Sequence, residues 1–90
     1  MKIREALRSF ERSHFKKRGG KAYRRLQLRR LYKFISFAES RGTFFIGQVG
    51  NTTFEAFFEA NQTAEKTRQY YRQAWRLLIN YSNFGKDPHQ

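Results

Sequence analysis

The twenty residues KAYRRLQLRRLYKFISFAES, numbered 21 to 40, decide the fold of this chain because their apolar positions recur with the period of an α-helix. At about 100° per residue, one face of that helix collects six apolar side chains. They are Tyr23, Leu28, Leu31, Phe34, Ile35 and Ala38, with Gln27 lying among them. Arg24 falls near this face but in the first turn, from which we expect it to reach solvent. The helix is predicted to end at RGT (41–43), where Gly42 can adopt the positive φ of a C-terminal cap.

A shorter helix is predicted before this stretch. Residues 2–16 carry Ile3, Leu7 and Phe10 at spacings of three and four. The run KKRGG (16–20) ends that helix, because either of its glycines can serve as a cap.

A connector, FFIGQVGN (44–51), follows the long helix. We expect Phe44 and Phe45 to anchor it on the core, although two adjacent aromatic residues in a loop also suit stacking on unpaired bases. A strand over 44–49 would have no partner elsewhere in the chain, so a connector is the better prediction.

Two more helices complete the fold prediction. The third covers residues 52–60 and begins with a capping box of Thr52 and Glu55. Its apolar face consists of Phe54, Phe57 and Phe58. The fourth covers residues 64–83, with Thr63 as its cap, and is followed by the tail 84–90. Its apolar face consists of Tyr70, Tyr71, Ala74, Leu77, Leu78 and Tyr81. Four helices with short connectors predict one compact, all-α, bundle-like domain over residues 1–90.

The composition limits what such a domain can do. Aromatic residues make up 18% of the 90 residues, which is enough for a small core. The chain has no cysteine, and His14 and His89 lack the spacing of metal ligands, so we expect no metal and no cofactor. No apolar run is long enough to cross a membrane. Because no acid–base pair or phosphate-binding loop is evident, we expect a cytoplasmic, nucleoid-associated binding protein without a small-molecule substrate, not an enzyme.

The positive charge is concentrated in one half of the chain. The formal net charge is +12; residues 1–45 hold 14 basic and 3 acidic residues, whereas residues 46–90 hold 5 basic and 4 acidic ones. Such a concentrated field favours a nucleic acid or an anionic membrane surface as the partner.

The second predicted helix carries a row of four cations at successive steps of four residues. They are Lys21, Arg25, Arg29 and Lys33, opposite or beside the apolar face. The first acid of that helix is Glu39, near its end. Like charges at this spacing destabilise an isolated helix slightly, so a row kept only for solubility would more plausibly alternate in sign. We interpret the row as a phosphate-binding surface, and a solvated basic face is the alternative.

The fourth predicted helix carries a second polar row. Its members are Arg68, Arg72 and Arg76, with Gln69 and Gln73 beside them and Lys66 and Thr67 in the first turns. Arginine pairs with guanine and glutamine with adenine in the major groove, and a helix N-terminus can hold a phosphate. We therefore predict base contacts from this row. An ordinary polar helix face is the alternative, because arginine and glutamine are also good helix formers.

The layout resembles the core-binding, or SAM-like, domain of the tyrosine recombinases, the phage-integrase family. The pieces that carry the resemblance are LRSFERSHFKKRG (7–19), LYKFISFAESRG (31–42), IGQVGNTTFEAFFEA (46–60) and TAEKTRQYYRQAWRLLINYSNFG (63–85). Where the family ends its last helix with Asn-Pro, this chain has Asp87 and Pro88. The resemblance spans nearly the whole chain and consists mostly of spaced apolar positions.

The resemblance implies an all-α module that clamps one face of double-stranded DNA, with its second and fourth helices towards the major groove and the backbone. It also implies a C-terminal catalytic domain or further recombinase protomers as partners, since the family's catalytic residues are absent from these 90 residues. Two other functions stay open. The first is a stand-alone protein-interaction or regulatory module of a mobile element. The second is RNA binding, which the aromatic and arginine content also suits.

Overall fold

Four α-helices and one short 3₁₀ turn make up the described part of the chain. The elements are α1 (Ile3–Lys16), α2 (Lys21–Ser40), η1 (Ile46–Gln48), α3 (Asn51–Ala60) and α4 (Glu65–Phe84). The structure is a computed structural model that describes residues 1–16 and 21–84, with side chains described for 1–12 and 22–81. The all-α prediction is confirmed, and each predicted helix boundary lies within one residue of the observed one.

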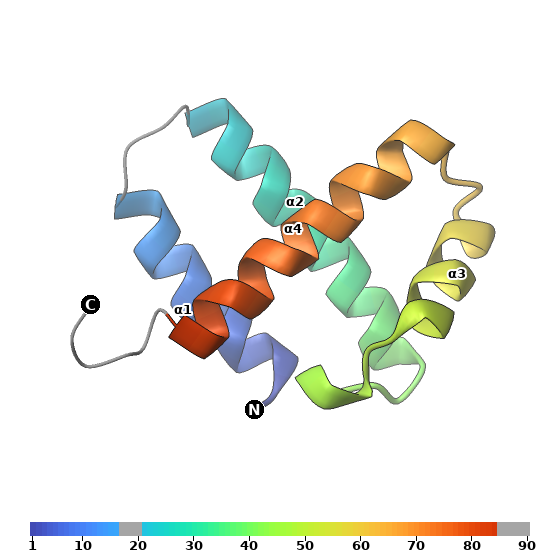
Figure 1. Cartoon of the computed structure of the whole chain (residues 1–90), viewed down its shortest axis with the longest axis horizontal. Coiled ribbons are helices and arrows are strands. Elements are labelled where there is room, and N and C mark those ends of the chain that lie inside the picture. The colour runs from blue at the N-terminus through green and yellow to red at the C-terminus, as the bar shows by residue number, and fades with distance from the viewer. Residues whose placement is uncertain (17–20, 85–90) are drawn as a thin grey trace.

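The helices form two hairpins that cross each other (Figure 1). Helices α1 and α2 run antiparallel, and α4 passes in front of α2 in the view shown. Two side-chain contacts fix the register of the first hairpin: Arg4 meets Glu39, and Tyr32 meets Glu11. Helices α3 and α4 form the second hairpin, joined by residues 61–64.

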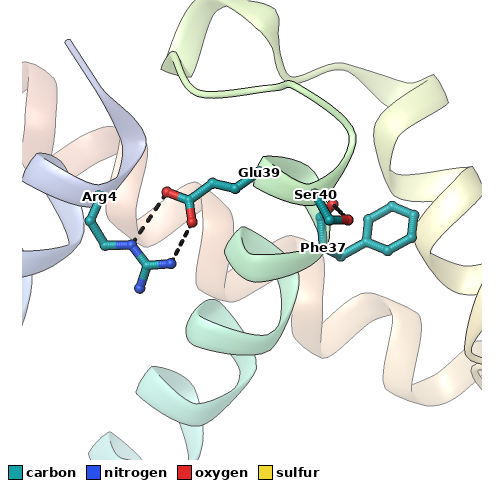
Figure 2. Close-up of polar contacts among 4 residues, drawn as sticks. All are labelled: Arg4, Phe37, Glu39 and Ser40. Atoms are coloured by element: carbon teal, nitrogen blue, oxygen red, sulfur yellow. Dashed lines mark hydrogen bonds and ion pairs between the residues drawn. The ribbon is translucent and has the colours of Figure 1, made fainter.

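An ion pair connects the start of α1 to the end of α2 (Figure 2). Arg4 donates from Nη2 to Glu39 Oε1 over 2.6 Å and from Nε to Oε2 over 3.3 Å. Each charge stands at the end of its helix that the macrodipole disfavours, so pairing relieves both. The hydrogen bond to Glu39 and its negative charge raise the pKa of the Arg4 guanidinium.

Phe34 of α2 lies at the centre of the core. Its ring stacks on Phe54 of α3, with ring centroids 4.4 Å apart, and meets the edges of Phe57 and Trp75. Because α2 supplies the residue that α3 and α4 both pack against, the apolar face of residues 21–40 organises the whole domain. Gln27 is buried within that face, as predicted.

The connector between α2 and α3 differs from the prediction. Phe44 and Phe45, expected to anchor it, are about half exposed, and Ile46 and Val49 pack against the core instead. The backbone explains the exchange. Ile3 donates to the carbonyl of Phe44 and Ile46 donates to that of Met1, so the connector lies against the chain's first residues with its two phenylalanines turned outward.

Among the described helices, the predicted cap was correct at α2 and wrong at α3 and α4. Gly42 ends α2 with φ +83°, as expected. Helix α3 begins one residue earlier than predicted, with Gly50 as its cap. The Gly50 N–H donates to Thr53 Oγ1 over 3.2 Å, so Thr53 fills the role assigned to Glu55.

Ala64, not Thr63, precedes the first turn of α4, and its carbonyl accepts from the Arg68 N–H. The predicted stops at Gly19, Gly20, Gly85 and Pro88 lie outside the described residues.

Four side chains lie differently from their expected positions. Tyr23, Tyr70 and Leu77 were placed on apolar faces but are exposed, whereas Arg24 was expected in solvent and is 6% exposed. The crossing of the hairpins explains the first three: α4 meets α2 at one crossing, not along its length, so residues on the flanks beyond it stay uncovered.

Candidate nucleic-acid interface

The cationic row of α2 faces solvent. Arg25, Arg29 and Lys33 are all exposed. Since Leu31 and Ile35 on the opposite side of the same helix are fully buried, the row points away from the core. The side chain of Lys21, the fourth predicted member, lies outside the described residues.

Helix α1 extends this basic surface, which our sequence reasoning missed. Arg8 and Arg12 are exposed on the helix beside α2. Arg8 lies close enough to Tyr32 for its charge to oppose the rise in that tyrosine's pKa. The spacing of Arg4, Arg8 and Arg12, four residues apart, was the signal in the sequence. We call the set Arg8, Arg12, Arg25, Arg29 and Lys33 the basic face.

The carboxylates of Glu11 and Glu39, which lie between α1 and α2, each bind a side chain of the other helix. Glu11 accepts a hydrogen bond from Tyr32 Oη, and Glu39 pairs with Arg4. The hydrogen bond to Glu11 and partial burial raise the pKa of Tyr32. Within the described residues, none of the five cations of the basic face forms an ion pair. These five cations are therefore open to an anion, and Glu5, exposed on α1 one turn before Arg8, adds one negative charge beside them.

Two arginines of the predicted row on α4, Arg68 and Arg72, make contacts within the domain. Arg68 donates from Nε to the Thr63 carbonyl and lies over the ring of Phe58. Arg72 donates to Asn51 Oδ1 over 3.2 Å and lies over the rings of Phe54 and Phe58. These arginines join α4 to α3, so base contacts by them would first require these interactions to break.

The remaining predicted members of the α4 row stay accessible in different degrees. Lys66, Gln69, Gln73 and Arg76 are exposed, whereas Thr67 is half-buried. Gln73 and Arg76 line a shallow groove against Tyr23 of α2, which is described below.

The structure does not bring the two rows together on one surface. Helix α4 packs on the buried side of α2 through contacts such as Phe34 with Trp75, and the basic face lies on the other side of α2. Gln69 lies on α4 opposite the buried Tyr71 and Leu78, hence away from α2, whereas Arg76 lines the groove that α4 shares with Tyr23 of α2. The domain is thin, 16 Å in its shortest Cα extent. Because α4 passes in front of α2 in Figure 1, side chains that point away from this crossing on the two helices face opposite sides of the domain.

Comparisons with known proteins gave no match: no family model, no curated protein and no solved structure is significantly similar to the chain. None of the described helices is long and apolar enough to cross a membrane. Within residues 1–16 and 21–84, no cluster of histidine and acidic side chains is suited to a metal ion. The candidate interface is thus defined by its own geometry and charge.

Proposed function

We propose that the protein is a module that binds duplex DNA through the phosphate backbone, using the basic face of α1 and α2. The observation that carries the proposal is the exposure of five cations on two adjacent helices whose intervening carboxylates, Glu11 and Glu39, are bound to other partners. Phosphate contacts of this kind supply most of the affinity of non-specific DNA binding.

The resemblance to the core-binding domain of tyrosine recombinases suggests the kind of protein in which such a module would act. Under this proposal the chain serves as the DNA-clamping part of a site-specific recombinase, or of a small relative from a mobile element, and chemistry belongs to another domain. The contact differs from the clamp implied by the resemblance, because one helical hairpin supplies the phosphate contacts and the row on α4 does not join them.

The salt dependence of binding tests the proposal. If the five cations neutralise about five phosphates, the logarithm of the association constant for a short duplex should fall against the logarithm of salt concentration with a slope of about −4.5. Fluorescence anisotropy with duplexes of unrelated sequence measures it. A slope close to zero would exclude phosphate binding as the source of affinity.

A pair of charge reversals locates the contact. Arg25→Glu with Arg29→Glu should weaken binding to every duplex alike and reduce the magnitude of the slope by about two. Lys66→Glu with Arg76→Glu changes the net charge by the same amount on α4 and is the matched control. We expect this control to lose far less affinity. Equal losses from both double variants would show that the basic face is not the contact surface.

A further inference from the structure

A second surface of the domain has a chemistry unlike that of the basic face. It lies where the flanks of α2 and α4 meet beside their crossing, and it exposes four large apolar side chains: Tyr23, Leu26, Tyr70 and Leu77. Tyr23 is 58% exposed and the other three are 37–39% exposed. In contrast, the basic face has charged side chains and one partly exposed tyrosine, Tyr32, whose hydroxyl is bound to Glu11.

Contacts between the two helices place Tyr23, Tyr70 and Leu77 where α2 and α4 meet, and Leu26 follows Tyr23 by three residues along α2. The guanidinium of Arg30 in α2 lies 4.6 Å from the ring centroid of Tyr70 in α4. Beside this contact, an open groove of ≈ 260 Å³ is lined by Tyr23 from α2 and by residues of α4. The α4 residues are Gln73, Arg76, Leu77 and Asn80. We call Tyr23, Leu26, Arg30, Tyr70, Gln73 and Leu77 the α2–α4 corner.

The spacing in the corner is the same on both helices. Tyr23, Leu26 and Arg30 follow at steps of three and four, as do Tyr70, Gln73 and Leu77, so each helix presents one continuous stripe. Two such stripes flanking a groove can accept the apolar face of a third helix, whose anchors recur at the same steps. Tyrosine, arginine and leucine in this setting are typical of protein interfaces more than of phosphate contacts.

The charges around the corner indicate which charge the polar side of the docked helix should carry. Arg76 lines the groove, Arg30 lies over the ring of Tyr70, Lys66 lies on α4 one turn before Tyr70, and none of the residues that line the groove is acidic. A second copy of this chain would bring another net charge of +12 to a cationic rim, which opposes self-association. A helix with carboxylates flanking its apolar face complements the rim instead.

We propose that the α2–α4 corner is a docking site for an acidic amphipathic helix of a partner protein. None of the six residues of the corner belongs to the basic face, so we expect the partner and a duplex to bind at the same time. The proposal does not depend on DNA binding, since a domain that ignores DNA would still offer the same apolar groove.

A designed peptide tests the docking site on the full chain. The probe is a fluorescent amphipathic helix of about 18 residues, long enough to follow the α4 stripe at about 1.5 Å per residue, with leucine and tryptophan on one face and glutamate on the other. Its controls are a peptide with lysine replacing each glutamate and one with the same acidic composition in scrambled order. We expect the acidic amphipathic peptide to bind at least about tenfold more tightly than either control.

Substitutions in the corner separate this site from other apolar surfaces. Leu26→Ser and Leu77→Ser should each weaken the peptide at least about fivefold, because each removes an apolar contact at an already exposed position. Phe44→Ser, which changes an exposed aromatic residue in the connector, is the matched control and should leave peptide affinity unchanged. The helical circular dichroism of all three variants should equal that of the parent chain.

Three results would overturn the proposal. The first is equal binding of the acidic and scrambled peptides, or equal binding by the corner variants and Phe44→Ser. The second is competitive displacement of the peptide by a short duplex, which would make the corner part of the DNA-binding surface. The third is a dimer, seen by sedimentation, that Leu26→Ser and Leu77→Ser abolish, which would make a second copy the occupant. Additive binding of duplex and peptide would support it.

Discussion

A single hydrogen bond, from the hydroxyl of Tyr32 to Glu11, joins α2 to α1 beside the basic face and favours the neutral form of the tyrosine. While Tyr32 is protonated, its hydroxyl donates a hydrogen bond to the carboxylate of Glu11. Loss of the phenolic proton would place two negative charges side by side. The neutral phenol is therefore the form that the folded domain favours, which is why the pKa of Tyr32 is raised.

The first prediction concerns this pKa. Glu11→Ala removes both the acceptor and the negative charge, so it should lower the pKa of Tyr32. The measurement is the pH titration of phenolate absorbance, with Tyr32→Phe identifying the signal that belongs to this residue. If Glu11→Ala leaves that titration in place, Glu11 is not the cause of the shift.

The same bond sets a pH window for stability. Because the folded pKa lies above the unfolded value of about 10, the bond contributes fully at pH below about 10 and is lost as pH rises through the folded pKa. The difference in free energy of unfolding between the parent chain and Tyr32→Phe should therefore be constant near neutral pH and shrink in strong alkali.

Individual side chains were the least predictable level of this structure. Apolar spacing placed Phe34 and Gln27 correctly on the buried face of α2. It failed for Tyr23 and Tyr70, which lie near the edges of their faces. It also failed for Arg24, which lies in the first turn of α2 on the same side of the helix as Leu31 and Ile35. The burial of such residues depends on whether a neighbouring helix covers them, and the sequence of one helix does not show this.

At the scale of elements, the packing of α4 against α3 holds two arginines, Arg68 and Arg72, that we had predicted to contact bases. Arg72 covers two phenylalanine rings of α3 and reaches Asn51 at its start. A planar guanidinium can stack and donate at once, whereas a lysine at the same position could not do both. The step of four residues between Arg68 and Arg72 thus serves helix packing.

The second prediction follows from this packing. Arg72→Ala should lower the free energy of unfolding by about 1 kcal/mol, through the lost stacking and one hydrogen bond. Arg76→Ala, one turn along on the exposed face, should change it by less than about 0.5 kcal/mol. Urea denaturation of both variants gives the comparison. Two equally small effects would mean that Arg72 does not stabilise the α3–α4 corner.

Helix existence and boundaries were the most predictable level. Residues 21–40 have an uninterrupted apolar period and a glycine at the required end, and the observed α2 has the same bounds. The α3 start was shifted because Gly50 is the cap and Thr53 accepts the hydrogen bond from its N–H, the two roles predicted for Thr52 and Glu55. The sequence shows which residues could cap a helix, but the path of the preceding connector decides which of them does.

At the scale of the whole molecule, helical wheels could not predict how the two polar rows lie relative to each other. A wheel shows that each row lies opposite an apolar face. When two such helices bury those faces against each other, their polar rows must point in opposite directions. The crossing of α2 and α4 does this, so the burial that forms the core also separates the basic face from Gln69.

The last prediction tests this separation directly and uses the absence of cysteine from the chain. Ser36 is exposed on the outer side of α2, one turn beyond Lys33, and Gln69 is exposed on the outer side of α4. In Ser36→Cys and Gln69→Cys variants, bound duplex should slow alkylation of the cysteine on α2 several-fold and leave the one on α4 nearly unchanged. The alkylation rates are read by mass spectrometry at equal duplex saturation. Because the two positions lie on opposite faces of a thin domain, equal protection of both would require DNA to cover the whole molecule, and the assignment of the basic face would then be wrong.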